Sequence, residues 1–115
     1  MSDDCLFCKI AAGEIPTNIV YQDDQVVAFE DISPQAPHHL VIIPRQHIAT
    51  VNDLEDEHEE LFGKLASTAK RLAAERGIDG SGYRLVMNCN GAAGQTVFHI
   101  HLHLLGGRSL TWPPG

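Results

Sequence analysis

Residues 94–107 read Gly-Gln-Thr-Val-Phe-His-Ile-His-Leu-His-Leu-Leu-Gly-Gly, and three histidines alternate with apolar residues in this stretch. Side chains at positions i, i+2 and i+4 of a β-strand point to the same face. We therefore expect His99, His101 and His103 on one face of a strand, spaced by roughly 6.5–7 Å. The opposite face carries the apolar residues that would anchor the strand to a core, namely Ile100, Leu102 and Leu104.

The chemistry of this row is that of imidazole, which can act as a nucleophile, a general acid or base, or a ligand of a phosphate or a metal. Residues 90–96 precede the row and are rich in glycine and small side chains, so their N–H groups can approach an anion closely. The combination indicates phosphate chemistry with a histidine nucleophile, and His101, the middle residue, is flanked by two histidines that could position it or bind its substrate. A half-buried strand with a polar face, or a metal site using part of the row, are the alternatives.

Composition limits the class of protein. The 115 residues are enough for one domain, expected to span residues 1–115, and the 43% hydrophobic content is typical of a globular chain. A formal net charge of −7 argues against nucleic acid or an anionic membrane as partner, but a mononucleotide needs only a local pocket. The acidic N-terminus has no apolar signal segment and no apolar run could span a bilayer, so we expect a cytoplasmic protein.

The remaining patterns predict an α+β fold with an antiparallel sheet. Residues 18–22 and 25–30 read as a hairpin, residues 38–44 as a third strand and residues 83–88 as a fourth. The period of the third strand places His39 and Val41 on one face.

A long helix is predicted between the third and fourth strands. Asn52 and Glu55 resemble a capping box at its start, and Arg76-Gly77 resembles a C-cap. His58 falls among charged residues and is expected to be exposed. The apolar stripe repeats every three to four residues and comprises Leu54, Leu61, Leu65, Ala69 and Leu72, widened by Phe62, Ala66 and Ala73.

Cys5 and Cys8 form a Cys-x-x-Cys near the N-terminus. This spacing suits two ligands of one zinc ion but supplies only half of a structural site. Redox use and simple apolar packing are the alternatives, although no βαβ pattern follows to favour a redox site. Three cysteines, an odd number, do not indicate a disulfide framework.

The His-Ile-His-Leu-His-Leu-Leu motif resembles the signature of the histidine triad (HIT) family, in which histidines alternate with apolar residues. The Gly-Gly-Arg that follows, the closing Trp-Pro-Pro-Gly, Asp-Ile-Ser-Pro-Gln-Ala-Pro at residues 31–37 and Gly-Gln-Thr-Val at residues 94–97 resemble its Hint branch. The resemblance extends from about Cys5 to the C-terminus. It implies an antiparallel sheet of about five strands, one long helix, a short N-terminal helix, and a homodimer whose sheet is continuous, with residues 108–115 at the interface.

The resemblance also implies a function, the hydrolysis of purine nucleoside 5′-phosphoramidates through a nucleotidyl-histidine. His101 would be the nucleophile, and the other catalytic residues would be His103, His39, His99 and Thr96. Thr96 stands where the branch usually has serine. No cofactor is required for catalysis. The nucleotide would be bound by Leu6, Phe7, Ile10, Ile15, Phe29, Asp31, Ile32, Val41, Asn88, Gly94, Gln95 and Trp112.

Family members with the N-terminal Cys-x-x-Cys tend to bind zinc. By resemblance, the ligands of a structural zinc would be Cys5, Cys8, His47 and His99. Two other functions stay open: a dinucleoside polyphosphate hydrolase of the related Fhit type, against which the C-terminal motif argues, and a nucleotide- or zinc-binding scaffold without activity, against which the complete triad argues.

Overall fold

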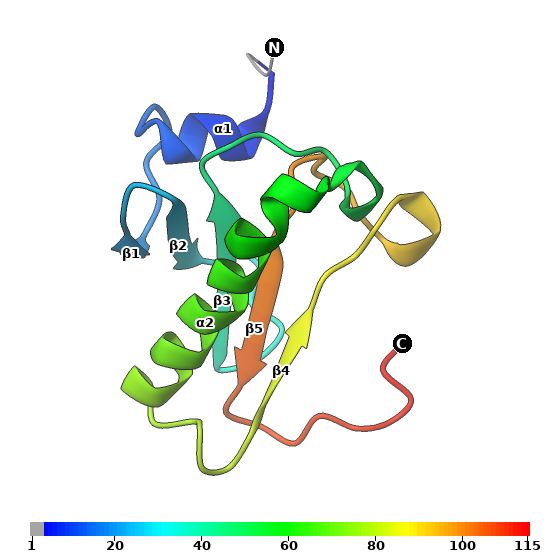
Figure 1. The fold of residues 1–115 in the computed structure, drawn as a ribbon. Helices are drawn as coiled ribbons and strands as arrows, with labels where there is room; N and C mark the ends of the chain where they lie inside the picture. Colours follow the sequence, from blue (N-terminus) through cyan, green and yellow to red (C-terminus); the bar gives the residue numbers. More distant parts are fainter. Residues whose placement is uncertain (1–3) are drawn as a thin grey trace.

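Residues 4–115 are described by the computed structural model, in which five strands form one antiparallel sheet (Figure 1). The strands are β1 (Ile19–Gln22), β2 (Val26–Glu30), β3 (His38–Pro44), β4 (Tyr83–Val86) and β5 (Leu102–Gly106). Their order is β1-β2-β3-β5-β4, so the last strand lies between β3 and β4. The helices are α1 (Leu6–Ala11) and α2 (Glu59–Glu75). The predicted α+β class, with its short and long helices, is confirmed.

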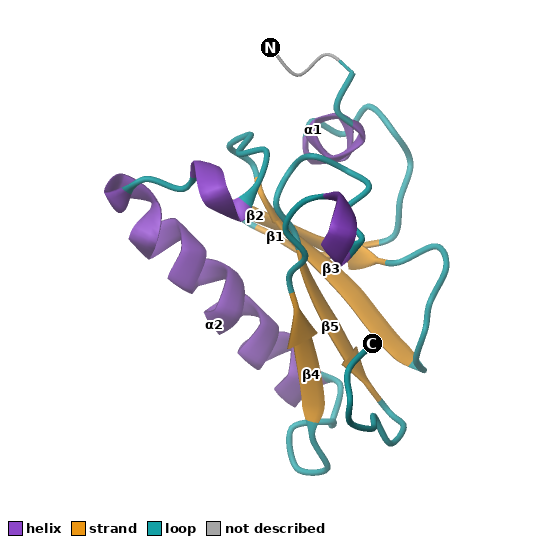
Figure 2. Ribbon diagram, turned by 90° about the vertical axis from the view of Figure 1, so that its right-hand side faces the viewer, coloured by secondary structure: helices purple, strands orange, loops and turns teal. Residues whose placement is uncertain are grey.

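Alternate residues of each strand point to opposite sides of the sheet, and a different helix packs on each face. Helix α2 runs along one face, as Figure 2 shows, and packs on a core that includes Leu40, Ile42 and the predicted anchors Ile100, Leu102 and Leu104. The other face carries a smaller cluster of buried residues, in which α1 contributes the first two: Phe7, Ile10, Val27, Phe29, Val41 and Ile43. The site described below lies on this second face.

The expectation that all three histidines lie in one strand is wrong. Strand β5 begins at Leu102, so only His103 belongs to it. The hydrogen-bond ladder between β5 and β3 does not continue to His99 and Ile100, because groups of these two residues bond to other parts of the chain. The side chain of His99 bonds to the carbonyl of Pro44 at 2.7 Å, and the N–H of Ile100 donates to the carbonyl of Ile48 at 2.8 Å. The regular strand geometry therefore does not include the first two histidines.

The helix also begins later than predicted. Two short 3₁₀ turns, Val51–Asp53 and Asp56–His58, come first, and α2 starts only at Glu59. The capping box of the first turn is formed by Thr50 and Asp53, not by Asn52 and Glu55. His58 is buried rather than exposed, because its Nδ1 accepts the N–H of Glu55 at 2.9 Å and so fixes the turn that precedes the helix.

The apolar stripe of α2 is partly as predicted. Leu65, Ala69, Leu72 and Ala73 are buried, whereas Phe62 and Ala66 are exposed. Thr68 takes a buried place that the hydrophobic pattern did not assign to it. Its hydroxyl donates to the carbonyl of Lys64 at 2.7 Å, which satisfies the polar group inside the core. The helix ends at Glu75, followed by Arg76 as C-cap and Gly77 at φ 71°, in agreement with the predicted C-cap.

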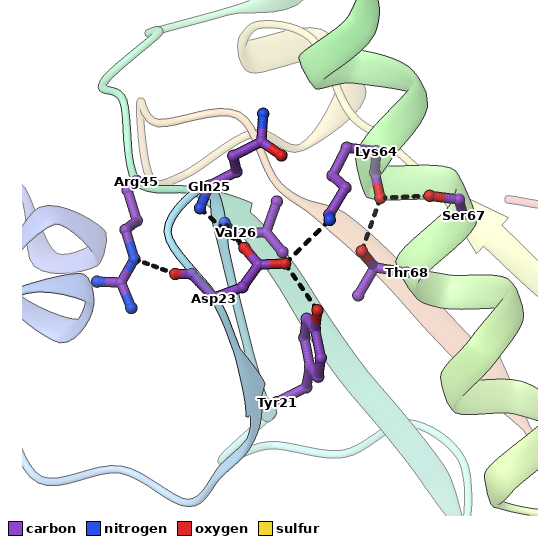
Figure 3. A network of polar contacts seen from close by, with 8 residues as sticks. All are labelled: Tyr21, Asp23, Gln25, Val26, Arg45, Lys64, Ser67 and Thr68. Carbon is purple, nitrogen blue, oxygen red and sulfur yellow. Dashed lines mark hydrogen bonds and ion pairs between the residues drawn. The ribbon is translucent and has the colours of Figure 1, made fainter.

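Asp23 in the β1–β2 turn ties the hairpin to α2 (Figure 3). Its carboxylate accepts the hydroxyl of Tyr21 at 2.7 Å and the N–H groups of Gln25 at 2.8 Å and Val26 at 2.9 Å. The ammonium of Lys64 lies 3.0 Å away. Burial by itself would raise the pKa of Asp23, but these hydrogen bonds stabilise the anion and hold the pKa well below its usual range.

The fourth strand ends at Val86, two residues before the predicted end. Within residues 4–115, no helix is long and apolar enough to cross a bilayer. The N-terminal residues 1–3, on which the expectation of no signal peptide partly rests, lie outside the described residues.

Candidate active site

A cavity of about 630 Å³ opens on the face of the sheet that carries α1. Most of the predicted catalytic and nucleotide-binding residues line it: Leu6, Phe7, Ile10, Ile15, Phe29, Asp31, Ile32, His39, Val41, Asn88, Gly94, Thr96, His101 and His103. Three predicted residues do not line it, namely Gln95, His99 and Trp112. The cavity has an apolar end and an end with imidazoles, so it can take a ligand with one flat apolar part and one anionic part.

The apolar end is built on Phe7 and Phe29, whose ring centroids lie 5.5 Å apart in an edge-to-face arrangement. Both rings are almost fully buried. Ile32 is the opposite case, since it lines the cavity while 96% of its surface is exposed. A large apolar side chain held in solvent at the rim is suited to cover a flat ring that enters the cavity.

His101 is held in one tautomer by its backbone neighbour. Its Nδ1 lies 2.8 Å from the carbonyl oxygen of His99, and a carbonyl can only accept, so Nδ1 carries the proton. The lone pair is therefore on Nε2, the nitrogen that a nucleophile needs. Burial lowers the pKa of His101, although the carbonyl and the charge of Asp31 oppose this change. The neutral, nucleophilic imidazole is thus the favoured form at neutral pH.

His39 and His103 are also held in defined tautomers. The N–H of Gln35 donates to Nδ1 of His39 at 3.0 Å, so the proton of His39 is on Nε2. That Nε2–H donates to Nδ1 of His103 at 2.9 Å. His103 consequently carries its proton on Nε2 and can donate it to a ligand. Burial lowers the pKa of His39, and burial together with the neighbouring imidazoles His101 and His39 lowers that of His103 to about 4.

Gln95 does not line the cavity, but its side chain holds the loop that precedes the histidines in place. This side chain is buried, its Oε1 accepts the N–H of Asn90 at 2.7 Å, and its Nε2 donates to the carbonyls of Ala49 at 2.8 Å and Val97 at 3.1 Å. Gly94 has φ 95°, a conformation that favours glycine. Gln95 is therefore a structural residue of the loop that presents Gly94 and the exposed Thr96 to the cavity.

Asp31 lies at the rim between the two ends of the cavity. Its Oδ1 accepts the N–H of Ser33 at 2.8 Å, and its Oδ2 lies 3.4 Å from Nε2 of His39. A carboxylate in this position can accept hydrogen bonds from vicinal hydroxyl groups of a ligand. Asn88 follows the end of β4 and lines the same cavity.

The predicted zinc ligands come together beside this cavity. Ligand atoms of Cys5, Cys8, His47 and His99 all lie within 4.8 Å of one another. The distances from Nδ1 of His99 to the two sulfurs are 3.3 and 3.4 Å, and that from His47 to Cys8 is 3.3 Å. Neighbouring N and S ligands of a tetrahedral zinc would be about 3.5 Å apart. The Nε2–H of His99 donates to the carbonyl of Pro44, so its Nδ1 lone pair faces the thiols, as a metal ligand requires.

A second group of potential metal ligands is formed by Asp31, His39 and His103. In this group the ring nitrogen of His39 that would bind a metal carries a proton instead of a free lone pair. For His39 to bind a metal through Nε2, its proton would have to move to Nδ1. That nitrogen already accepts the N–H of Gln35, and two donors would then face each other. The tautomers therefore favour a metal at the cysteine cluster and a hydrogen-bonding role for the pair in the cavity.

Some residues of the cavity were not predicted, namely Pro16, Thr17, Ser33, Gln35 and Val97. Gln35 matters most, because its backbone N–H sets the tautomer of His39. Its place in the loop that leads into β3 is the only signal in the sequence. A backbone donor cannot be recognised from residue type, so this contact needed the structure.

Comparison with known proteins agrees with this geometry. Residues 12–110 match the HIT domain. The purine nucleoside phosphoramidase of Escherichia coli K12 is 54% identical over 110 residues, which cover 96% of this chain and 92% of that protein. An uncharacterized HIT-like protein of Synechococcus elongatus is 53% identical over the whole of both chains. The crystal structure of a HIT family hydrolase from Legionella pneumophila Philadelphia 1 superposes with a TM-score of 0.95 at 58% identity, covering 96% of this chain and 99% of that chain.

The match of most of the chain to the family, the high identity to full-length relatives and the histidines His39, His101 and His103 in the cavity lead to the same result: this chain belongs to the HIT family.

Proposed function

We propose that this chain is a nucleoside phosphoramidase, which hydrolyses purine nucleoside 5′-phosphoramidates to a nucleoside monophosphate and an amine. The observation that carries the proposal is the tautomer of His101, whose Nδ1–H bonds to the carbonyl of His99 and leaves the Nε2 lone pair for attack. The identity to a relative named purine nucleoside phosphoramidase supports the same substrate class.

In the first step, Nε2 of His101 attacks the α-phosphorus, the P–N bond to the amine breaks, and a nucleotidyl-histidine forms. The amine leaves with a proton that Thr96, at the edge of the cavity, transfers to it. In the second step, water attacks the phosphorus and returns a proton to Thr96, the bond to Nε2 breaks and the nucleoside monophosphate leaves. Dividing one displacement into two lowers the highest barrier.

Charge on the phosphoryl oxygens is stabilised by His103, whose Nε2–H is available because Nδ1 accepts the N–H of His39. His39 acts through His103, and the N–H groups of the glycine-rich loop provide further donors. The base lies between the apolar walls near Phe7, Phe29 and Ile32, and Asp31 accepts the ribose hydroxyls.

Zinc is a second part of the proposal. Cys5, Cys8, His47 and His99 would hold one structural zinc ion, and their mutual distances and the tautomer of His99 support this ligand set. The ion would join the N-terminal helix to the chain segment that carries His101. No chemical step depends on it.

The third part of the proposal is that the chain forms a homodimer. Strand β4 is at the edge of the sheet, and its Leu85 is 40% exposed, so pairing of two β4 strands would continue the sheet into a second copy. Trp112 is 81% exposed in residues 108–115, where it could reach the cavity of that copy. The molar mass in solution, with and without Leu85→Asp, tests this arrangement. A wild-type protein that is monomeric at micromolar concentration would refute it.

The test of the reaction is turnover of adenosine 5′-phosphoramidate by the wild-type protein, His101→Asn and the matched control His38→Asn. His38 lies on β3 opposite Gly106 of β5 and does not line the cavity. We expect activity in the wild type and the control, a loss of at least about 10³-fold in His101→Asn, and a nucleotidyl-protein adduct in acid-quenched single turnovers. Faster turnover of a dinucleoside polyphosphate would indicate the Fhit-type reaction, and no turnover of either substrate by folded protein would indicate a scaffold.

A further inference from the structure

We infer that metal binding at the Cys5, Cys8, His47 and His99 cluster controls the affinity of the neighbouring cavity for its nucleotide, by fixing the first turn of α1. The inference rests on the proposed function, because the nucleotide and the zinc ion belong to it. It assigns a positioning role to the two cysteines and predicts which kinetic constant the metal changes.

The first argument is that one short helix carries parts of both sites. Cys5 is the N-cap of α1, where its sulfur accepts the N–H of Cys8 at 3.3 Å. Between and after these cysteines, Leu6, Phe7 and Ile10 line the apolar end of the cavity. The thiols and the base-binding side chains therefore alternate within two turns, and a movement of one set moves the other.

The second argument is that, among residues 4–115, the first turn of this helix is held by one buried apolar side chain, Phe7, and by the two thiols. Helix α1 has six residues, which is too short for a helix to be stable by itself. Its C-terminal end is tied down, because Arg45 donates to the carbonyl of Ala11 at 2.7 Å and Ile10 is buried. In the first turn, Leu6 is 43% exposed, and Phe7 is the buried apolar anchor.

Besides Phe7, whose ring packs against Phe29 and His101, the two thiols supply long-range polar contacts of that turn. Cys5 lies 3.3 Å from Nδ1 of His99, which is 94 residues away in the chain, and Cys8 lies 3.3 Å from Nδ1 of His47. Thiol–imidazole hydrogen bonds are weak, whereas bonds to a metal ion would fix both cysteines rigidly. Leu6, which is 43% exposed, should therefore depend most on the metal for its position in the cavity wall, because Phe7 is also held by its contacts with Phe29 and His101.

The nucleophile, by contrast, is held without the metal. His99 is fully buried and its Nε2–H donates to Pro44, while Ile100 donates its N–H to Ile48. These bonds keep the His99 carbonyl in place, and this carbonyl orients His101. Loss of the metal should consequently weaken nucleotide binding and leave kcat at saturating substrate nearly unchanged.

The experiment measures the Kd of AMP by calorimetry for zinc-loaded and metal-free wild-type protein. We expect about tenfold weaker binding without zinc, with kcat changed by less than about twofold. Because coupling between two ligands is reciprocal, AMP should tighten zinc binding by the same factor. Amide hydrogen exchange of residues 5–9 should accelerate when zinc is removed.

Two variants separate the metal from other effects. His47 is an exposed member of the cluster that does not line the cavity, so His47→Asn should bind AMP like metal-free wild type and not respond to zinc. Cys89→Ser removes the thiol outside the cluster and should retain the wild-type affinity and zinc response.

Equal AMP affinity with and without zinc would overturn the inference, as would failure of the wild-type protein to bind zinc. A fall in kcat with unchanged Kd would also overturn it, because the metal would then act through His99 and His101. If zinc-loaded protein binds no AMP, the proposed function fails and the inference fails with it. If AMP binds and is independent of zinc, only the inference fails.

Discussion

The imidazoles of His39 and His103 form a directed pair, in which Nε2–H of His39 donates to Nδ1 of His103 across 2.9 Å. The direction follows from the Gln35 N–H, which occupies the other nitrogen of His39. The pair leaves the Nε2–H of His103 free for a ligand, so a residue from β3 determines what β5 presents to the cavity.

This relationship predicts the effects of two substitutions at His39. His39→Leu removes the donor and should lower kcat by about 100-fold, whereas His39→Gln keeps an amide N–H near the Nε2 position and should lose only about tenfold. Steady-state kinetics at saturating phosphoramidate check this order. Equal losses in the two variants, with unchanged folding, would show that His39 does not act through a hydrogen bond to His103.

The hydroxyl of Thr96 should matter in proportion to how poor the leaving group is. Thr96→Ala should slow the release of an alkylamine by about 100-fold and have little effect on a nitrophenolate ester of AMP, which leaves without a proton. Thr96→Ser keeps the hydroxyl and should retain activity towards both substrates. The ratio of kcat/KM for the two substrates is the measurement. If Thr96→Ala lowers kcat/KM equally for both substrates, Thr96 only shapes the loop.

The buried imidazoles should make stability fall as the solution becomes acidic. Burial lowers the pKa of His103 and of His99 to about 4, whereas an unfolded histidine has a pKa of about 6.5. Between these values the unfolded chain binds more protons than the folded one, so the free energy of unfolding decreases as pH falls from 6.5 towards 4.

Chemical unfolding of metal-free protein at pH 7 and pH 4.5 tests this, with His103→Asn as comparison. The loss of stability between the two pH values should be smaller in the variant by roughly 1–3 kcal/mol. If the wild-type protein and the variant lose the same amount, His103 does not titrate below its ordinary range.

Gln95 should be more important for stability than its position in a loop indicates. Gln95→Glu would place a carboxylate against the carbonyls of Ala49 and Val97, which now accept hydrogen bonds from its amide. We expect a loss of roughly 2–4 kcal/mol in the free energy of unfolding, and roughly 1–3 kcal/mol for Gln95→Leu. Denaturant midpoints measure both. A Glu variant as stable as the Leu variant would argue against the donor role of the amide.

The directions of side chains that follow from local strand geometry were predicted correctly. The alternation in residues 38–44 placed His39 and Val41 on the cavity face and Leu40 and Ile42 in the core, because side-chain direction in a strand changes with each residue. The apolar residues between the histidines were assigned to the core for the same reason.

The errors occur where a hydrogen bond from a particular backbone group, near or distant in the chain, changes the local preference. His99 lies before the start of β5 and outside the cavity, and its ring bonds to the carbonyl of Pro44, 55 residues away in the chain. His58 is buried through a bond to the backbone of Glu55, and Thr68 through a bond to Lys64. The prediction that His58 is exposed rested on its charged neighbours, and the hydrophobic pattern gave no reason to bury Thr68.

The sequence by itself determined the family, the order of the elements and the residue types of the cavity, since these depend on periodicity and on a specific motif. Only the tertiary structure decided which nitrogen of each imidazole carries a proton and towards which group each ring points. The reason is that these properties depend on single donors and acceptors brought together from distant parts of the chain, such as His39 and His103 or Cys5 and His99.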